Sequence, residues 1–459
     1  MTFLSISRQK FESVYYGRTP FVQLFSTELA WYCAVVGEVT LLGVLLRCEI
    51  DKDFNAIILG RDLAKKYRAI DVIVSLESPE AVHEEMNARV AKLVNAHVEG
   101  LFPQGDEPGA FEIFGPKVSE AKRNHYLRLL LEDAVHFPAK VMMEELAYWF
   151  KDPDGNFIRG VQGNEFNSRL FELYLYAMFY GLDFEMDRSY AQPDFLLRKA
   201  GQTISVEATT VAEIDPAAPP MEINEAALDD LQTYVNVVMP FKFARTLRKK
   251  MRHRPLPTEV HYWELPHTQG HPFVLAVHDY SRRMSMTMSS DAMRNYLYGI
   301  VFQDGYFESI EAHVNSEERL PSNFFAKEEN RFVSAVMLPT MATIPKFNRM
   351  GQIAGIPAPG TVTMIFGKRT DEHGEPRLFS ARVDDPSYQE FWHEGTFVFH
   401  NPNAVFPLNP ELFPHVIHFF ETENGYEQWL PANYMISGTT QVIKIVKEGN
   451  PKGEEGKAD

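Results

Sequence analysis

The stretch of residues 164–280 carries the order of patterns that most restricts how this chain can fold. Apolar residues recur there at helical spacing, and three short apolar runs follow, LDFEMDR, PDFLLRK and TISVEATTV. A long helical region is predicted over about 224–253, with Pro240 kinking or splitting it, and the buried strand PFVLAVHDY follows at 272–280. The order helix–strand–strand–strand–helix–strand predicts an α/β core in the middle of the chain.

The regions on both sides of this core predict further structure, because 459 residues exceed the roughly 100–200 that one hydrophobic interior usually serves. Short apolar runs over 31–76 predict a small antiparallel sheet, and a helix is predicted over 78–97. We therefore expect an N-terminal mixed α/β domain (1–155), the α/β core (156–345) and a C-terminal β-rich region with a disordered tail (346–459).

The composition indicates a globular chain, with 45% apolar and 23% charged residues. The longest apolar stretch, Trp31 to Leu46, is interrupted by glycines and is better explained by a hairpin than by a membrane span. No basic start leads into an apolar run, so no secretory signal is expected. Cys33 and Cys48 are too few for a disulfide framework. These features together predict a cytoplasmic protein without a membrane segment.

The formal net charge of −17 argues against general binding of nucleic acid, which depends on basic residues that neutralise phosphates. Any such contact must be local. The sequence lacks a GxSxG elbow, a GxxxxGK[ST] phosphate loop and a GxGxxG turn, so acyl transfer and nucleotide-driven activity have no positive support.

Acidic residues stand at particular places in the predicted core. Pro193-Asp194 begins its second strand, and Glu207 lies in the third, followed by Ala208 and Thr209. With the order of elements, these residues resemble the PD-(D/E)XK phosphodiesterase superfamily over about a quarter of the chain. The resemblance implies a restriction-endonuclease-like αβββαβ core and a metal-dependent nuclease acting on DNA, in defence or repair.

The chemistry of this acidic pair can be argued from the residues themselves. Phosphodiester cleavage needs a divalent cation, and Mg²⁺ or Mn²⁺ can be held by one or two carboxylates. Alternate side chains of a strand share a face, so Glu207 should point away from Val206 and Ala208 and meet Asp194 across the hairpin. Glu172, on the preceding helix, matches an acidic position of several branches. The simpler alternatives are a turn residue for Asp194, an edge-strand carboxylate that faces water for Glu207 and a solvated helix stripe for Glu172.

The resemblance fails at Thr209, where the superfamily usually has a lysine. Some branches supply that lysine from the following helix, and here Lys242, Arg245, Lys249 and Arg252 form one basic stripe. We expect Lys249, or alternatively Lys242, to take the lysine's place and the stripe to contact DNA phosphates. A solvated helix face is the alternative interpretation of the stripe.

Two hypotheses follow. The first is a nuclease that uses Mg²⁺ or Mn²⁺, with Asp194 and Glu207 as metal ligands and Glu172 and Lys249 as further catalytic residues. The second is a catalytically inactive nuclease-fold protein that acts as a nucleic-acid or protein interaction module, which Thr209 and the negative charge favour. Protein partners or a homo-oligomer stay open under both hypotheses.

Overall fold

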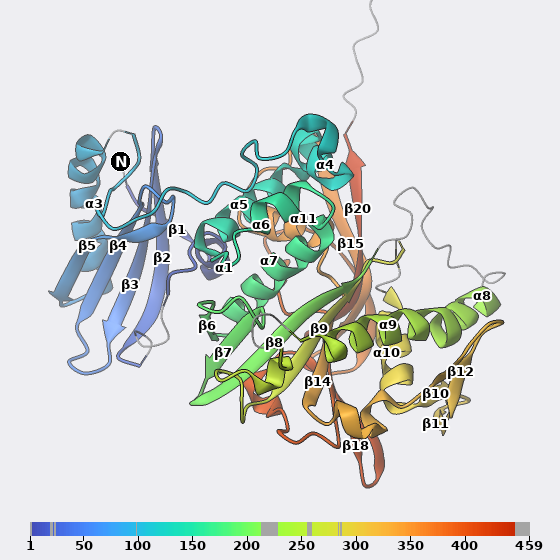
Figure 1. Cartoon of the computed structure of the whole chain (residues 1–459). Helices are drawn as coiled ribbons and strands as arrows, with labels where there is room; N and C mark the ends of the chain where they lie inside the picture. The colour runs from blue at the N-terminus through green and yellow to red at the C-terminus, as the bar shows by residue number, and fades with distance from the viewer. Residues whose placement is uncertain are drawn as a thin grey trace, which may run out of the picture.

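The N-terminal region forms an antiparallel five-stranded sheet that lies beside the rest of the chain (Figure 1). Helix α3 packs on it through Val82, Met86 and Val90, and begins after Ser78, whose side chain accepts the Ala81 N–H. The predicted sheet over 31–76 and the predicted helix over 78–97 are confirmed. The elements are β1 (Leu4–Ile6), α1 (Arg8–Glu12), β2 (Ser26–Val36), β3 (Val39–Cys48), β4 (Phe54–Arg61), β5 (Tyr67–Leu76) and α3 (Pro79–Ala96).

These elements belong to a computed structural model with a mixed α/β architecture. It describes residues 2–18, 22, 24–97, 99–212, 228–254, 259–282, 284 and 287–445. The expected disordered tail lies almost wholly outside these residues, as does the start of the predicted helix at 224. None of the described helices is both long and apolar enough to cross a membrane.

An eight-stranded mixed sheet forms the centre of the molecule, in the order β19-β18-β17-β14-β9-β8-β7-β6. The meander β6-β7-β8 is antiparallel, whereas β8 and β14 both run parallel to β9. The strands are β6 (Glu185–Asp187), β7 (Phe195–Lys199), β8 (Gln202–Val211), β9 (Phe273–Asp279), β14 (Val333–Pro339), β17 (Thr396–His400), β18 (Ile417–Thr422) and β19 (Gly425–Trp429).

Helices cover both faces of the central sheet (Figure 1). One face packs against α5, α7 and α11, and the other against α9 and α10. The predicted helix over 224–253 is split as expected, because a π-helical turn (Tyr234–Val238) and Pro240 separate α8 from the body of α9. The helices are α4 (His125–Glu132), α5 (Phe137–Trp149), α6 (Phe157–Gln162), α7 (Phe166–Gly181), α8 (Leu228–Thr233), α9 (Met239–Arg252), α10 (Ser289–Tyr298) and α11 (Ile344–Ile353).

Smaller elements complete the fold. A three-stranded sheet has the order β16-β15-β20, and two ribbons pair β10 with β11 and β12 with β13. The strands are β10 (Ile300–Gln303), β11 (Tyr306–Ser309), β12 (Ala312–Val314), β13 (Arg319–Pro321), β15 (Thr361–Thr370), β16 (Pro376–Arg382) and β20 (Met435–Lys444). The short 3-10 helices are η1 (Glu120–Lys122), η2 (Ala134–His136), η5 (Tyr262–Glu264), η7 (Phe324–Ala326), η8 (Glu328–Asn330) and η9 (Pro410–Leu412).

The structure differs from the expected domain boundaries. The boundary after residue 345 cuts through one sheet, since β14 pairs with β17 and β17 with β18. The boundary after residue 155 cuts through one core, in which Met142 and Leu146 of α5 pack in the same cluster as Phe171 of α7. Apolar faces from segments that are distant in the sequence pack together across both of the expected boundaries.

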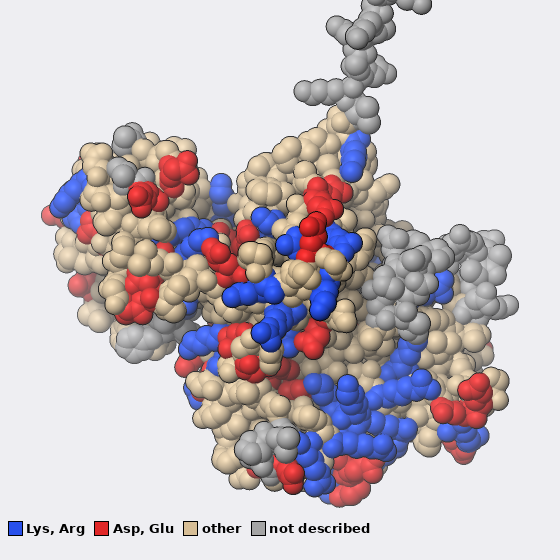
Figure 2. All heavy atoms as spheres, turned by 45° about the horizontal axis from the view of Figure 1, so that its top comes forward, with Lys and Arg blue, Asp and Glu red and all other residues tan. Residues whose placement is uncertain are grey.

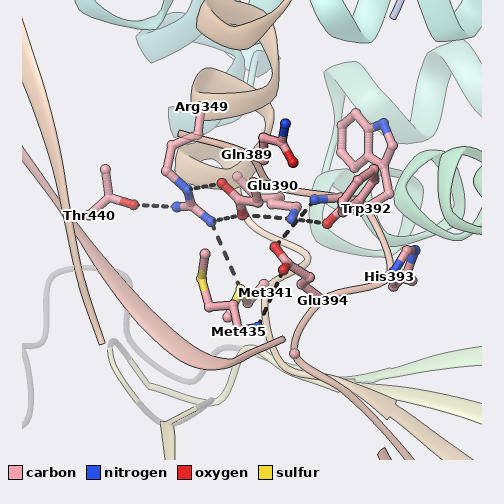
Figure 3. A network of polar contacts seen from close by, with 12 residues as sticks. Met341, Arg349, Gln389, Glu390, Trp392, His393, Glu394, Met435 and Thr440 are labelled. Atoms are coloured by element: carbon pink, nitrogen blue, oxygen red, sulfur yellow. Dashed lines mark hydrogen bonds and ion pairs between the residues drawn. The ribbon is translucent and has the colours of Figure 1, made fainter. Parts of the chain in front are cut away.

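A fully buried charged network fastens α11 to the loop before β17 (Figure 3). Lys346 Nζ lies 2.6 Å from Glu390 Oε1, and Arg349 donates to both oxygens of Glu390 at 2.7 and 2.8 Å. Arg349 also donates to Thr440 of β20, and Tyr388 donates to Glu390 at 2.7 Å. The network, which we call the Glu390 cluster, joins three segments that are distant in the sequence.

Candidate active site

Asp194 and Glu207 meet at one end of the β7–β8 hairpin. Phe195 pairs with Val206 in the antiparallel register, which places Asp194 opposite Glu207. The Ala208 N–H donates to Asp194 Oδ2 at 2.7 Å, and the Asp194 N–H donates to Glu207 Oε2 at 3.3 Å. The backbone of each strand therefore holds the carboxylate of the other, as the strand pattern predicted.

Glu207 points to the face of the sheet that α9 covers. Val206 and Ala208 pack into the opposite core, with the aromatic residues of α7, in agreement with the predicted alternation. Thr210, on that same α7 side, lies 3.1 Å from Ser168 between their hydroxyl oxygens. The alternation of β8 thus separates an apolar face from one that carries a buried carboxylate.

Lys250 of α9 is the basic residue that approaches the acidic pair. Its Nζ lies 2.5 Å from Glu207 Oε1, and the Tyr262 hydroxyl also hydrogen-bonds with Glu207. Lys249, the expected residue, is exposed. One step along a helix turns a side chain by about 100°, so neighbouring lysines face different surroundings.

A signal for Lys250 was present in the sequence. The apolar residues Phe243, Leu247 and Met251 form the buried face of α9, and Lys250 lies three positions after Leu247. A lysine beside the apolar stripe is carried toward the sheet, whereas Lys249 continues the outer basic stripe. The regular spacing of the basic residues indicates Lys249, whereas their position relative to the apolar face indicates Lys250.

Glu172 lies on α7 and is almost completely buried. Arg169 donates to its Oε1 at 2.9 Å, and Arg188 Nη2 lies 3.9 Å from its Oε2. Burial and the nearby charge of Asp194 raise the pKa of Glu172 to about 8, although Arg169 and Arg188 act in the opposite direction. Glu172 therefore interacts electrostatically with Asp194, as a third carboxyl group beside the pair.

The basic side chains nearby only partly neutralise the carboxyl groups of Asp194, Glu207 and Glu172. Burial and the charge of Asp194 raise the pKa of Glu207 to about 7, although Lys250 acts in the opposite direction. Burial alone would lower the pKa of Lys250, but Glu207 and Asp194 reverse that effect and raise it. An added positive charge at this place would stabilise the ionised form of all three carboxyl groups, Glu172 included.

The residues present fit a hard divalent cation with two protein ligands. Among the residues that the structure describes, no three His, Cys, Asp or Glu side chains are arranged to hold a metal ion together. Asp194 and Glu207 supply carboxylate oxygens, the donor type that Mg²⁺ and Mn²⁺ prefer. Mg²⁺ is commonly held by one or two carboxylates, with water and phosphate oxygens as its other ligands. The pair is sufficient for binding of that kind.

Basic side chains form a continuous field over α9 (Figure 2). Arg245 is 75% exposed, and Lys249 and Arg252 line one surface hollow with Arg248, which the predicted stripe did not include. Lys242 lies apart, because its Nζ is directed to the Tyr234 hydroxyl at 3.3 Å. Arg245, Arg248, Lys249 and Arg252 are called the basic field below.

Comparison of the chain with protein-family models, with curated proteins and with solved structures found no match.

Proposed function

We propose that the protein is a nuclease that uses Mg²⁺ or Mn²⁺ and acts on DNA. The observation that carries the proposal is the meeting of Asp194 and Glu207 across the β7–β8 hairpin with Lys250 bound to Glu207. Two carboxylates can hold the divalent ion that assists phosphodiester cleavage, and an ammonium group beside them can stabilise negative charge that develops on the phosphate. Lys250 takes the place of the lysine that Thr209 replaces.

Each residue has a physical role in this proposal. Asp194 and Glu207 would hold the divalent ion, which neutralises charge on the phosphate and lowers the pKa of a bound water. Lys250 orients Glu207 and brings a positive charge to the place where negative charge develops. Glu172 is a positioning residue, because its charge acts on Asp194 while Arg169 and Arg188 hold its side chain.

The basic field supports a polyanionic substrate. Lys249 directly precedes Lys250 on α9, so one residue of the basic field is next to the lysine that contacts Glu207. Cations of this kind bind backbone phosphates without reading sequence. A chain with a net charge of −17 needs a local group of basic residues to bind nucleic acid, and the basic field supplies one.

Cleavage assays test the proposal directly. Fluorescent DNA incubated with Mg²⁺ or Mn²⁺ should be cut by the wild-type protein and left intact in EDTA. Asp194→Asn and Glu207→Gln should each abolish cleavage, because each removes one ligand charge. Glu185→Gln, on an exposed residue of the same sheet, is the matched control and should retain activity. Full activity in both site variants rejects the assignment.

A second candidate function is a binding module without catalysis. It is favoured by the engagement of Glu207, whose two oxygens already accept hydrogen bonds from Lys250 and from the Asp194 N–H. Calorimetry with Mg²⁺ and Mn²⁺ separates the two functions. Absence of metal binding at millimolar concentration, with DNA binding retained, supports the module and contradicts the nuclease.

A further inference from the structure

A pocket lies beside the basic field and shares Arg248 and Arg252 with it. Lys327 adds a further cation, and Trp263 and Phe324 contribute aromatic rings to the lining. Met251, His261, Glu329 and Asn330 complete the lining. We call this the α9 pocket. It combines cations and rings at the end of a surface that is otherwise only basic.

His261 and Trp263, which line the α9 pocket, stack in parallel, and Phe332, outside the lining, also stacks parallel to Trp263. The centroids of His261 and Trp263 are 4.6 Å apart with an interplanar angle of 8°, and those of Trp263 and Phe332 are 5.5 Å apart with an angle of 4°. Trp263 is buried in the middle, whereas Phe332 is 39% exposed and His261 is partly exposed. The outer rings of this ladder are therefore accessible to a further flat group.

The cations of the pocket form no ion pair within the part of the chain that the structure describes, although Glu329 also lines the pocket. No carboxylate there lies within ion-pair distance of Arg248, Arg252 or Lys327. Burial and the charge of Arg248 lower the pKa of Lys327, and Glu329 only partly opposes them. Cations held close together in this way favour binding of an anion with several charges.

The pocket and the candidate active site share the short helix η5, which contributes residues to both. Tyr262 of η5 hydrogen-bonds with Glu207, while the flanking residues His261 and Trp263 belong to the ladder. Along α9, Lys250 contacts Glu207 and Met251 lines the pocket. The pocket and the acidic pair therefore adjoin the same two elements, α9 and η5.

We propose that the α9 pocket binds an unpaired base, so that the substrate is single-stranded nucleic acid; this rests on the proposed nuclease function. Cations alone bind single strands and duplexes, but the ladder adds a stacking surface that the bases of an intact duplex cannot reach. Bases stacked on aromatic side chains with basic residues on the backbone are the usual means of binding single strands. The ladder and the basic field supply both parts.

Fluorescence anisotropy in EDTA tests the proposal without cleavage. A labelled single-stranded oligonucleotide should bind at least about 10-fold more tightly than the duplex of the same sequence, because stacking adds to the phosphate contacts. Phe332→Ala should weaken single-strand binding about 10-fold and leave duplex binding unchanged. Arg252→Ala should weaken both and reduce the salt dependence by about one phosphate contact.

Matched controls separate stacking from loss of structure. Phe366→Ala removes a ring of similar exposure, 42%, from β15 and should leave binding unchanged. Thermal unfolding of each variant confirms that it is folded.

The outcomes are distinct. Duplex binding as tight as single-strand binding, no binding of either, or equal loss of both in Phe332→Ala overturns the α9 pocket proposal. Tight single-strand binding in EDTA without any cleavage in Mg²⁺ or Mn²⁺ contradicts the nuclease and leaves the pocket assigned. Cleavage that requires Asp194 but prefers duplex DNA contradicts the pocket proposal alone.

Discussion

In two groups of buried charged side chains, the surrounding charges shift the pKa of a glutamate in opposite directions. In the Glu390 cluster, burial would raise the pKa of Glu390, but Arg349 and Lys346 outweigh it and hold that pKa far below its usual range. At the candidate active site, Lys250 does not outweigh burial and the charge of Asp194, so the pKa of Glu207 rises to about 7. Burial and nearby charges therefore lower the pKa of Glu390 and raise that of Glu207, because the ratio of cations to carboxylates differs between the two groups.

The comparison shows how to tell a structural charge cluster from one that can bind a ligand. Two buried cations, Lys346 and Arg349, already balance the charge of Glu390, so an added cation would gain little there. Asp194 and Glu207 stand close together with Glu172 nearby, and each ionisation disfavours the next. The remaining negative charge is what a divalent cation would neutralise.

The largest effect is expected from Glu390→Gln. Removal of this charge leaves Lys346 and Arg349 buried without their counter-ion, and loss of one partner of a buried pair costs about 3–5 kcal/mol. Urea unfolding should show this decrease in the free energy of unfolding. Glu375→Gln, at an exposed position, should change it by less than about 0.5 kcal/mol. Equal stability of both variants would mean that the cluster contributes nothing.

Lys250→Met should give the next largest effect, on cleavage rather than on stability. Loss of a positioned charge that stabilises the transition state typically lowers kcat about 100-fold. Steady-state kinetics with single-stranded DNA measures this, at saturating Mn²⁺. Lys249→Met is the control on the adjacent residue and should raise KM with little change in kcat, since Lys249 belongs to the basic field. The reverse result would restore Lys249 as the catalytic lysine.

The two clusters should respond to pH in different ranges. Without metal, the raised pKa of Glu207 and Glu172 means that the folded state binds more protons than the unfolded state between about pH 4.5 and 8. Stability from these groups is present below about pH 4.5 and is lost as the pH rises toward 8. Glu390, with its lowered pKa, loses its contribution as the pH falls below about 4.5.

Urea unfolding in EDTA from pH 5 to pH 8 measures the first range. Asp194→Asn removes the charge that raises both pKa values and should flatten the decline, whereas Glu390→Gln should leave its slope unchanged. Each unit of pKa difference corresponds to about 1.4 kcal/mol, so the change in slope is measurable. A wild-type profile that rises over this range would contradict the assigned electrostatics.

The smallest effect is expected from metal alone. Mn²⁺ at ten times its Kd should raise the free energy of unfolding by about 1.4 kcal/mol through mass action. Asp194→Asn should remove this increment, and Glu390→Gln should retain it on a lower baseline. Thermal unfolding with and without Mn²⁺ gives both values. An increment that survives in Asp194→Asn places the ion elsewhere.

Much of the site could be predicted because it is local. Asp194 and Glu207 lie on consecutive strands joined by the tight turn at Ala200-Gly201, so the hairpin register places one opposite the other. The period of two in β8 separates Glu207 from its apolar neighbours. Glu172 was a weaker prediction, since its proximity to Asp194 depends on how α7 packs beside the sheet.

The choice of Lys250 over Lys249 could not be made from spacing alone. Which lysine reaches Glu207 depends on the rotation and tilt of α9 against the sheet, and apolar contacts from Phe243, Leu247 and Met251 set these. The expected domain boundaries after residues 155 and 345 likewise depended on tertiary contacts that local sequence patterns do not show. Local turns do not reveal whether distant strands, such as β14 and β17, share hydrogen bonds.

The sequence by itself determined the N-terminal sheet with its helix, the helices and strands over 164–280 and the acidic pair, because short-range periodicity and a hairpin turn settle them. Only the tertiary structure decided the partner of Glu207, the extension of the sheet by β17, β18 and β19, and the α9 pocket. That pocket gathers side chains from α9, η5 and η7, which are distant along the chain. Burial of apolar faces brings such segments together, and it depends on the shapes of all of them at once.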